Sequence, residues 1–170
     1  MVHNFDPVLI NLGLIKIHWY SLAYILGILF GWWYGRFIIK KKIKANDKEN
    51  YIKNFDDLIS YIIIGVIVGG RLGYVIFYNL DYYSQNLLEI FKLWQGGMSF
   101  HGGLLGTIIS IIIFSKKKQV NFFKFSDIIS CVAPVGILLG RIANFINGEL
   151  YGKITTLPWG VIFPNAGDLP

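Results

Sequence analysis

The segment 140–149, GRIANFINGE, places an arginine, two asparagines and a glutamate at the end of a long apolar stretch. A charged side chain at the centre of a bilayer costs roughly 2.5 to 3.5 kcal/mol on insertion scales, so an arginine retained in such a stretch needs a partner or a task. The planar guanidinium of Arg141 offers paired donors that match the oxygens of a phosphate group. Arg141 is therefore a candidate for binding a phospholipid headgroup or stabilising a departing phosphate.

His101 begins a second apolar stretch and is followed directly by Gly102 and Gly103. A histidine with a pKa near 6.5 can accept a proton from a thiol or a hydroxyl at neutral pH. We therefore interpret His101 as a candidate general base, with a structural histidine near the membrane interface as the alternative. Gly102 has no side chain, which could let a lipid headgroup reach the backbone.

Four further polar residues are candidates for binding substrate, and each has a simpler alternative. Arg71 could assist Arg141, or it could pair with backbone carbonyls or extend toward the interface. Glu149 and Asn144 could orient the arginines or accept hydrogen bonds from headgroup hydroxyls, but Glu149 could also merely neutralise Arg141. Tyr24 could contact lipid or belong to an aromatic belt.

The elements that must position these residues are membrane helices, because the composition is too apolar for a soluble domain. Of 170 residues, 54% are hydrophobic, 16% are aromatic and only 15% are charged, whereas about a quarter of a soluble domain is charged. We predict an all-α integral membrane protein, a polytopic helical bundle forming one membrane domain over 1–170. Four stretches approach the length needed to span a bilayer: about 19–39, 58–78, 98–114 and 127–146.

The lysines predict the orientation of these spans. Ten of them lie in the two connections 40–53 and 116–124, while only Lys16, Lys92 and Lys153 lie in the other connections and ends. The positive-inside rule then puts both lysine-rich connections in the cytoplasm and the N-terminus outside. This placement also argues against nucleic-acid binding as the reason for the net charge of +6.

The predicted orientation brings the candidate residues to one depth. With about 1.5 Å of rise per helical residue, Tyr24, Arg71, His101 and Arg141 all fall in the outer halves of their spans. We therefore expect a site that faces the outer leaflet. No metal site is expected, because the one cysteine, Cys131, has no ligand spacing around it.

Several local features refine this picture. Glycines recur four residues apart in every span, which predicts close helix packing. A mostly apolar segment near 85–95 predicts an interfacial helix, which either guides lipid or anchors the surface. Ser126 and Asp127 predict the N-cap of the fourth span, and Asn147-Gly148 predicts its end.

Two motifs resemble those of a known family, the prolipoprotein diacylglyceryl transferases. The segment 140–152, GRIANFINGELYG, closely resembles the family signature, and 101–104 resembles its HGGL motif. The residues at 5–7, 17–20, 158–160 and 163–167 also resemble family segments, so the resemblance covers nearly the whole chain.

The resemblance implies a bacterial inner-membrane enzyme whose active site faces the periplasmic leaflet. It would transfer diacylglycerol from phosphatidylglycerol to the lipobox cysteine thiol of a prolipoprotein, without a cofactor or metal. By motif match, His101 corresponds to the proposed base and Arg141 to the headgroup-binding arginine. Asn144 and Glu149 correspond to essential polar positions, and Tyr24 resembles an N-terminal tyrosine of the family.

The family has seven membrane helices, and the resemblance therefore implies that a chain of 170 residues is truncated. Two alternatives to an active transferase remain at this stage. One is a multi-pass transporter or lipid-binding subunit in which the arginines line a path for an anion. The other is an inactive truncated transferase that keeps the site.

Overall fold

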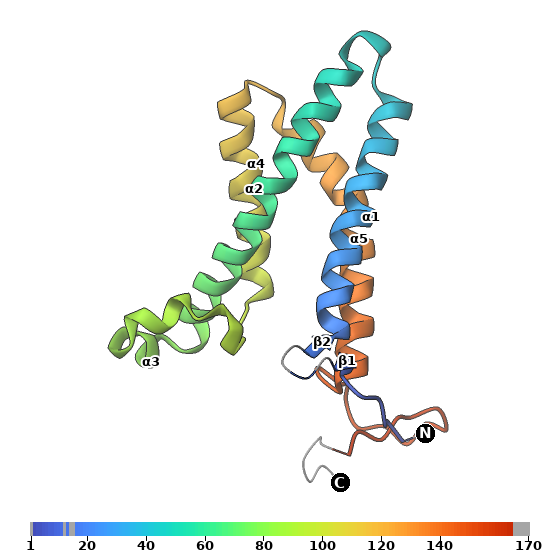
Figure 1. Ribbon diagram of the computed structural model, residues 1–170, viewed down its shortest axis with the longest axis vertical. Coiled ribbons are helices and arrows are strands. Elements are labelled where there is room, and N and C mark those ends of the chain that lie inside the picture. The colour runs from blue at the N-terminus through green and yellow to red at the C-terminus, as the bar shows by residue number, and fades with distance from the viewer. Residues whose placement is uncertain (1, 12, 14–15, 165–170) are drawn as a thin grey trace. The chain divides into compact units, whose positions relative to one another are not determined.

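The computed structural model describes residues 2–11, 13 and 16–164, and these are mostly helical (Figure 1). The long helices are α1 (Trp19–Lys42), α2 (Ala45–Tyr78), α4 (Phe100–Lys118) and α5 (Phe122–Asn147). Between α2 and α4 lie the short helix α3 (Leu80–Gln85) and two 3-10 helices, η1 (Leu87–Phe91) and η2 (Leu93–Gln95). Before α1, the strands β1 (Val8–Asn11) and β2 (Lys16–His18) form an antiparallel hairpin that the all-α prediction did not include.

The chain divides into two compact units, which we describe separately. The first contains residues 1–34 and 131–170, and the second contains residues 35–130. The boundaries therefore fall inside α1 and α5. The second unit holds all of α2 and α4, and the first holds the hairpin together with the N-terminal part of α1 and the C-terminal part of α5.

In the second unit, α2 and α4 lie side by side and antiparallel, with their backbones in contact (Figure 1). A methyl group added at Gly106 would lie 1.9 Å from the carbonyl oxygen of Gly65, and one at Gly102 would lie 2.2 Å from that of Gly69. Such close approach requires glycine on both helices, as the spacing of four predicts. The contact ends near Gly73, which faces Ser99 and Gly102 at the start of α4.

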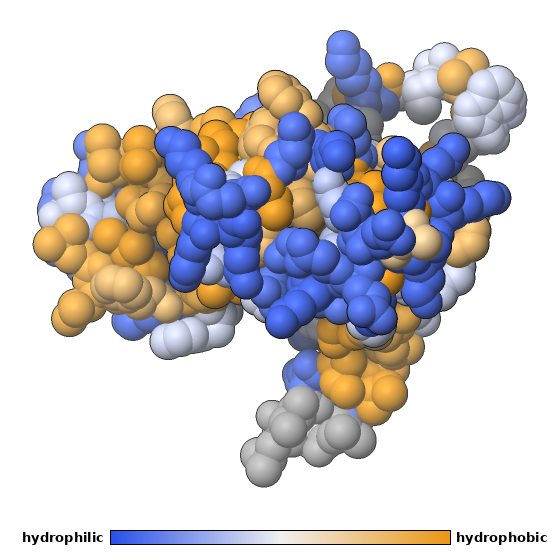
Figure 2. Space-filling model, turned by 90° about the horizontal axis from the view of Figure 1, so that it is seen from above, coloured by the Kyte–Doolittle hydropathy of each residue, from blue (hydrophilic) through white to orange (hydrophobic). Residues whose placement is uncertain are grey.

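The apolar core of the second unit lies at its lysine-rich end. Phe55, Leu58, Phe114 and Phe125 are fully buried there. Around them, the last residue of α4 and a lysine in the first turn of α5 contact the first half of α2: Lys118 Nζ is 2.8 Å from Asp57 Oδ2 and Lys124 Nζ is 3.0 Å from the Tyr51 hydroxyl. Figure 2 shows hydrophilic side chains gathered on the face seen from above. The two lysine-rich connections thus share one end of this unit.

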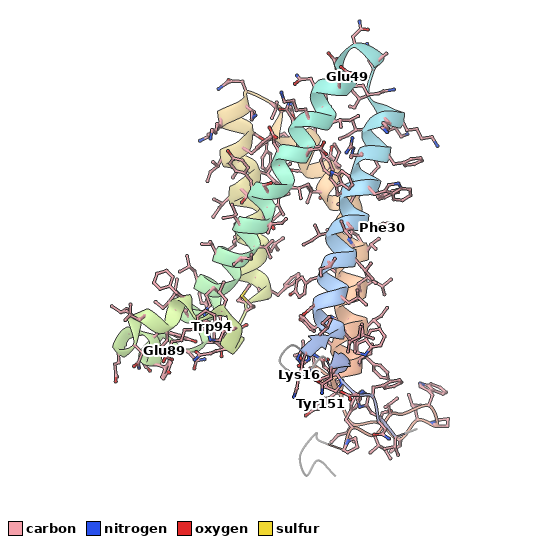
Figure 3. All side chains as sticks on the ribbon, in the orientation of Figure 1. Lys16, Phe30, Glu49, Glu89, Trp94 and Tyr151 are labelled. Atoms are coloured by element: carbon pink, nitrogen blue, oxygen red, sulfur yellow. The ribbon has the colours of Figure 1, made fainter. Side chains whose placement is uncertain are left out.

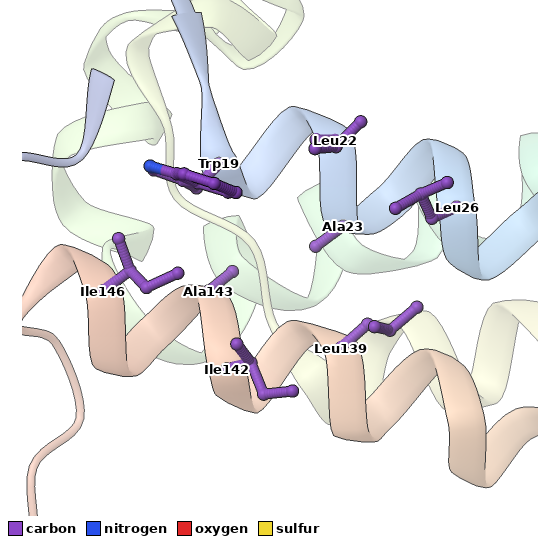
Figure 4. Close-up of a pocket in the computed structure, with 8 residues that line it drawn as sticks. All are labelled: Trp19, Leu22, Ala23, Leu26, Leu139, Ile142, Ala143 and Ile146. Atoms are coloured by element: carbon purple, nitrogen blue, oxygen red, sulfur yellow. The ribbon is translucent and has the colours of Figure 1, made fainter. Parts of the chain in front are cut away.

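In the first unit, α1 and α5 pack as an antiparallel pair through small residues. A methyl group added at Gly27 would lie 3.3 Å from the Gly136 Cα atom, and one at Gly31 would lie 3.7 Å from Val132. Toward the hairpin, the two helices leave an apolar groove of about 140 Å³ (Figure 4). Its walls are Trp19, Leu22, Ala23 and Leu26 from α1, and Leu139, Ile142, Ala143 and Ile146 from α5.

Three of the described helices, α1, α2 and α5, are long and apolar enough to cross a membrane. Each contains one of the predicted spans, so the chain is a helical membrane protein. Helix α4 contains all but the first two residues of the predicted span 98–114, but it is not among these three, because His101 and three terminal lysines shorten its apolar part. Four spans therefore stay a prediction.

One local prediction was wrong in position. Helix α5 begins at Phe122 rather than near Ser126, because the Asn121 side chain accepts a hydrogen bond from the Lys124 N–H at 3.1 Å and caps an earlier turn. The segment near 85–95 is helical as predicted in place, but it forms the two short 3-10 helices η1 and η2, and the Glu89 and Ile90 carbonyls of η1 accept hydrogen bonds from Arg71. That this segment lies in the membrane interface stays a prediction. The predicted end of α5 is confirmed, since the helix stops at Asn147.

Candidate active site

His101 lies in the first turn of α4, where Ser99 sets the start of the helix. The Ser99 hydroxyl oxygen accepts a hydrogen bond from the Gly102 N–H at 3.2 Å, and the Ser99 N–H donates to the Gly70 carbonyl of α2 at 2.9 Å. Ser99 is buried, whereas the His101 side chain is exposed on the unit. The exposed imidazole is thus carried by a turn whose backbone is fixed by the Ser99 hydrogen bonds.

Arg71 is almost fully buried, with 3% of its surface exposed, and it binds the segment that connects α3 to α4. Its Nε donates to the Ile90 carbonyl at 2.8 Å, and its two terminal nitrogens donate to four more carbonyls. These belong to Glu89 at 2.8 Å, Lys92 at 3.2 Å, Gly97 at 3.2 Å and Gly96. This geometry favours the alternative that the sequence left open, an arginine that pairs with backbone carbonyls.

Polar side chains on the outside of this segment form a second layer. The Glu89 carboxylate accepts hydrogen bonds from Lys92 Nζ, at 2.8 Å, and from the Tyr82 hydroxyl. The hydrogen bond from Lys92, followed by that from Tyr82, holds the pKa of Glu89 below its ordinary value. Figure 3 labels Glu89 and Trp94 here, and Glu49 at the opposite end of α2. Glu89 therefore stays ionised at neutral pH and supports the segment that Arg71 holds.

The first unit carries Arg141 and Tyr24 on its paired helices. Both side chains are exposed, and Tyr24 lies beside Tyr20 with 5.2 Å between ring centroids. The groove residues show the register, since Ala23 of α1 and Ala143 of α5 line the same groove. Tyr24 and Arg141 therefore lie at about the same level of this helix pair, while their depth in the membrane stays a prediction.

Asn144 and Glu149 lie where α5 ends. Asn144 is buried at 8% exposure, and its carbonyl accepts a hydrogen bond from the Glu149 N–H at 2.9 Å. Gly148 adopts a φ of +67°, which favours glycine and turns the chain out of the helix. The exposed Glu149 carboxylate accepts a bond from the Asn147 side-chain amide at 3.4 Å. The signature segment is thus a helix end followed by a tight turn.

The candidate residues form two groups. His101, Gly102 and Arg71 belong to the α2–α4 unit, while the others belong to the α1–α5 unit: Tyr24, Arg141, Asn144 and Glu149. Each group is gathered at one end of its helix pair. In the second unit this end lies opposite the lysines.

Comparisons with known proteins identify the family. A model of the prolipoprotein diacylglyceryl transferases matches residues 7–170. The chain belongs to this family. A phosphatidylglycerol–prolipoprotein diacylglyceryl transferase of Rickettsia canadensis is 53% identical over 98% of this chain, and one of Ehrlichia ruminantium is 51% identical over 97%. The relative in Wolbachia pipientis of Culex pipiens is 49% identical over 97% of the chain.

The chain spans about 60% of the length of these transferases, with shares of 60%, 61% and 63%. The family resemblance at 163–167 lies mostly outside the described residues, since 165–167 are not described. Together, the apolar helices and the family place the protein in a bacterial membrane.

Sequence reasoning missed the structural importance of two residues of this transferase-family chain. His3 is buried, donates from Nε2 to the Phe145 carbonyl at 2.6 Å, and packs against the Phe163 ring with 4.9 Å between centroids. Ser99 was also overlooked, although a serine directly before an apolar helical run is a capping signal. No comparable signal marked His3, because its partners are far away in sequence.

Proposed function

We propose that this chain forms the first part of a phosphatidylglycerol–prolipoprotein diacylglyceryl transferase. The family match over residues 7–170 carries the proposal, because it includes both the His101 and the Arg141 motifs. The substrates would be phosphatidylglycerol and the lipobox cysteine of a prolipoprotein. The product would be a thioether-linked diacylglyceryl group, the first step of lipoprotein modification.

In the proposed reaction, the cysteine thiol gives its proton to His101, and its sulfur attacks the glyceryl carbon that carries the phosphate. The carbon–sulfur bond forms as the carbon–oxygen bond breaks. The electron pair of that bond leaves with the oxygen of glycerol phosphate, where Arg141 stabilises the added negative charge. His101 later releases its proton to solvent. The exposed imidazole and the exposed guanidinium support these roles, since both must reach a substrate.

Four other residues would support binding. Tyr24 lies at about the level of Arg141, so its hydroxyl could contact the headgroup. Asn144 and Glu149 would contact substrate at the end of α5, and Gly102 would allow close approach of the lipid beside His101. In contrast, the donors of Arg71 are already taken by carbonyls, which does not support direct binding of the headgroup.

We also propose that α4 crosses the membrane as a fourth span and that the N-terminus lies outside. Its 19 residues measure about 28 Å, close to the roughly 30 Å of a hydrocarbon core. Its antiparallel packing on α2 supports this, because it brings the lysines at the end of α4 beside the N-terminal half of α2. That half of α2 lies next to the first lysine-rich connection, so both lysine-rich connections would be on the same side of the membrane. The site would then face the periplasmic leaflet of the inner membrane. A full-length protein would have seven spans.

The test is thioether formation on a lipobox peptide with phosphatidylglycerol vesicles. We would compare the 170-residue chain, the protein extended to the length of its relatives, and the His101→Ala and Arg141→Ala variants of the longer form. His18→Ala and Arg36→Ala are matched controls, since they remove the same side-chain types outside the site.

We expect activity in the longer protein, loss of activity in both site variants and retention in both controls. Absence of thioether in a folded longer protein would overturn the proposal and favour the transport or lipid-binding alternative. Activity in the longer protein but not in the shorter chain would indicate that the remaining helices are needed.

A further inference from the structure

We propose that Arg71 is a positioning residue for His101. It holds the segment 89–97 in the shape that leads into the first turn of α4. The proposed role in catalysis rests on the function proposed above, whereas the structural part does not. Three features of the second unit carry the inference: the saturation of the guanidinium, the path of the chain from Gly96 to Ser99, and the separate anchoring of α4 beyond Gly102.

The guanidinium of Arg71 has no donor left for a substrate. An arginine carries five N–H donors in a planar fork, and five carbonyl oxygens accept from this one. Its face also packs on Tyr83, with the Cζ atom 5.2 Å from the ring centroid. Since the side chain is buried and its charge is compensated by carbonyl dipoles, its role is to hold the backbone of residues 89–97 in place.

The carbonyls bound by Arg71 lead directly to the start of α4. Gly96 and Gly97 adopt φ angles of +80° and +83°, where glycine is favoured, and both carbonyls accept from Arg71. Two residues later, Ser99 bonds to the carbonyl of Gly70, the residue next to Arg71. Adjacent residues of α2 therefore hold the segment and the N-cap of α4.

The rest of α4 is held in another way. Gly102 and Gly106 touch the backbone of α2 at Gly69 and Gly65, which anchors the helix from Gly102 onward. His101 precedes this anchor, in the turn that depends on the Ser99 cap. Loss of Arg71 would therefore leave the helix in place but loosen the turn that carries the imidazole.

Spin labels can test this inference without any measurement of activity. In the full-length protein with Cys131→Ser and with any cysteine beyond residue 170 also replaced by serine, single cysteines would replace Leu88, Phe100 or Phe123, which are 82%, 65% and 72% exposed. The label at 88, directly before the segment 89–97, reports on that segment, and the label at 100 reports on the turn of His101. The label at 123 is a control within the same unit. Each would be measured with Arg71, Arg71→Ala, Arg71→Lys and the control variant Arg36→Ala.

We expect Arg71→Ala to increase label mobility at both 88 and 100 but not at 123. Millimolar guanidinium should lower the mobility again, because the free ion can bind the carbonyl oxygens that Arg71 no longer occupies. Arg71→Lys should have an intermediate effect, since one ammonium has three donors. Unchanged mobility at 100 in either variant would overturn the proposal. If Arg71→Ala does not fold, Arg71→Lys decides the result.

Kinetics supply the second test. Because a displacement of about 1 Å can cost about 100-fold in rate, we expect Arg71→Ala to lower kcat by about 10- to 100-fold, with little change in KM for phosphatidylglycerol and with partial rescue by guanidinium. A raised KM with unchanged kcat would instead identify a headgroup ligand and overturn the proposal. An inactive protein with Arg71 intact would contradict the proposed function, while the label mobilities would still decide the structural role.

Discussion

Helices α2 and α4 touch backbone to backbone, whereas α1 and α5 leave a groove lined by apolar side chains. A methyl group at Gly106 would lie 1.9 Å from a carbonyl oxygen, but one at Gly136 or Gly140 would have no atom within 4 Å among those of the described residues. The same spacing of glycines thus produces a locked pair in one unit and a looser pair in the other. Small-residue spacing alone does not predict how closely two helices pack.

The two arginines follow the same division. Arg71 belongs to the locked pair and is buried under five carbonyls, while Arg141 belongs to the looser pair and is exposed. Both look alike in the sequence, as single arginines within apolar runs. Their surroundings give Arg71 a structural role and leave the exposed Arg141 available for an anionic substrate.

The largest expected effect comes from filling the contact between the locked helices. Gly106→Ala should lower the free energy of unfolding by about 3 kcal/mol, because the added methyl group meets the backbone of α2 rather than a flexible side chain. Thermal unfolding in a lipid-like detergent would measure this loss. The matched change Gly136→Ala should alter stability by no more than about 1 kcal/mol. Equal losses for both variants would show that α1 and α5 pack as closely as α2 and α4.

The next effect separates the two arginines. Arg71→Ala should destabilise the protein by about 2 kcal/mol, because it removes a buried side chain that is the hydrogen-bond partner of five carbonyls. Arg141→Ala should change stability by less than about 0.5 kcal/mol, as expected of an exposed side chain, while abolishing thioether formation. The same melting assay, paired with the peptide assay, measures both. A large loss of stability in Arg141→Ala would assign it a structural role instead.

A smaller effect is expected in the groove between α1 and α5. Ala23→Leu should be tolerated and should raise stability by about 0.5 to 1 kcal/mol, since the groove of about 140 Å³ has room for added methyl groups. Melting temperatures would again provide the comparison, with Ala45→Leu at the exposed start of α2 as control. A clear destabilisation would show that this pair is as tightly packed as the other.

The smallest effect is a pH dependence in the segment held by Arg71. The pKa of Glu89 is lowered in the folded protein, so its contribution to stability is present above the ordinary glutamate pKa of about 4.3 and is lost as pH falls through the lowered value. A label at position 88 should therefore become more mobile at acid pH. Glu89→Gln should remove this dependence. An identical acid response in the variant would point to another titrating group.

Much of this organisation follows from sequence pattern alone. The apolar runs placed the long helices, and Asn147-Gly148 marked the end of α5 because a short turn has a local signal. The segment 87–95 was less predictable, since its shape depends on Arg71, which lies far from it in the chain. The start of α5 was misplaced because Asn121 and Ser126 are both capping residue types, and the sequence does not show that the Asn121 side chain accepts the capping hydrogen bond from the Lys124 N–H.

The sequence predicted which residues belong to the candidate site, but not which of them bind a ligand and which hold the structure. Burial and hydrogen bonding decide between a ligand-binding and a structural arginine, and neither is visible in a motif. The residues of the signature were identified from polarity within an apolar run, yet their assignment to two helix pairs emerged only from the contacts of their helices.

The contacts of His3 have a practical consequence for protein engineering. Its backbone N–H donates to the Ile162 carbonyl at 2.8 Å, and its ring bonds to Phe145, so the start of the chain is tied to the end of α5 and to residue 162. An affinity tag fused directly to the N-terminus would therefore disturb the end of α5, where Asn144 and Glu149 lie. A flexible spacer before the tag should therefore preserve more activity than a direct fusion.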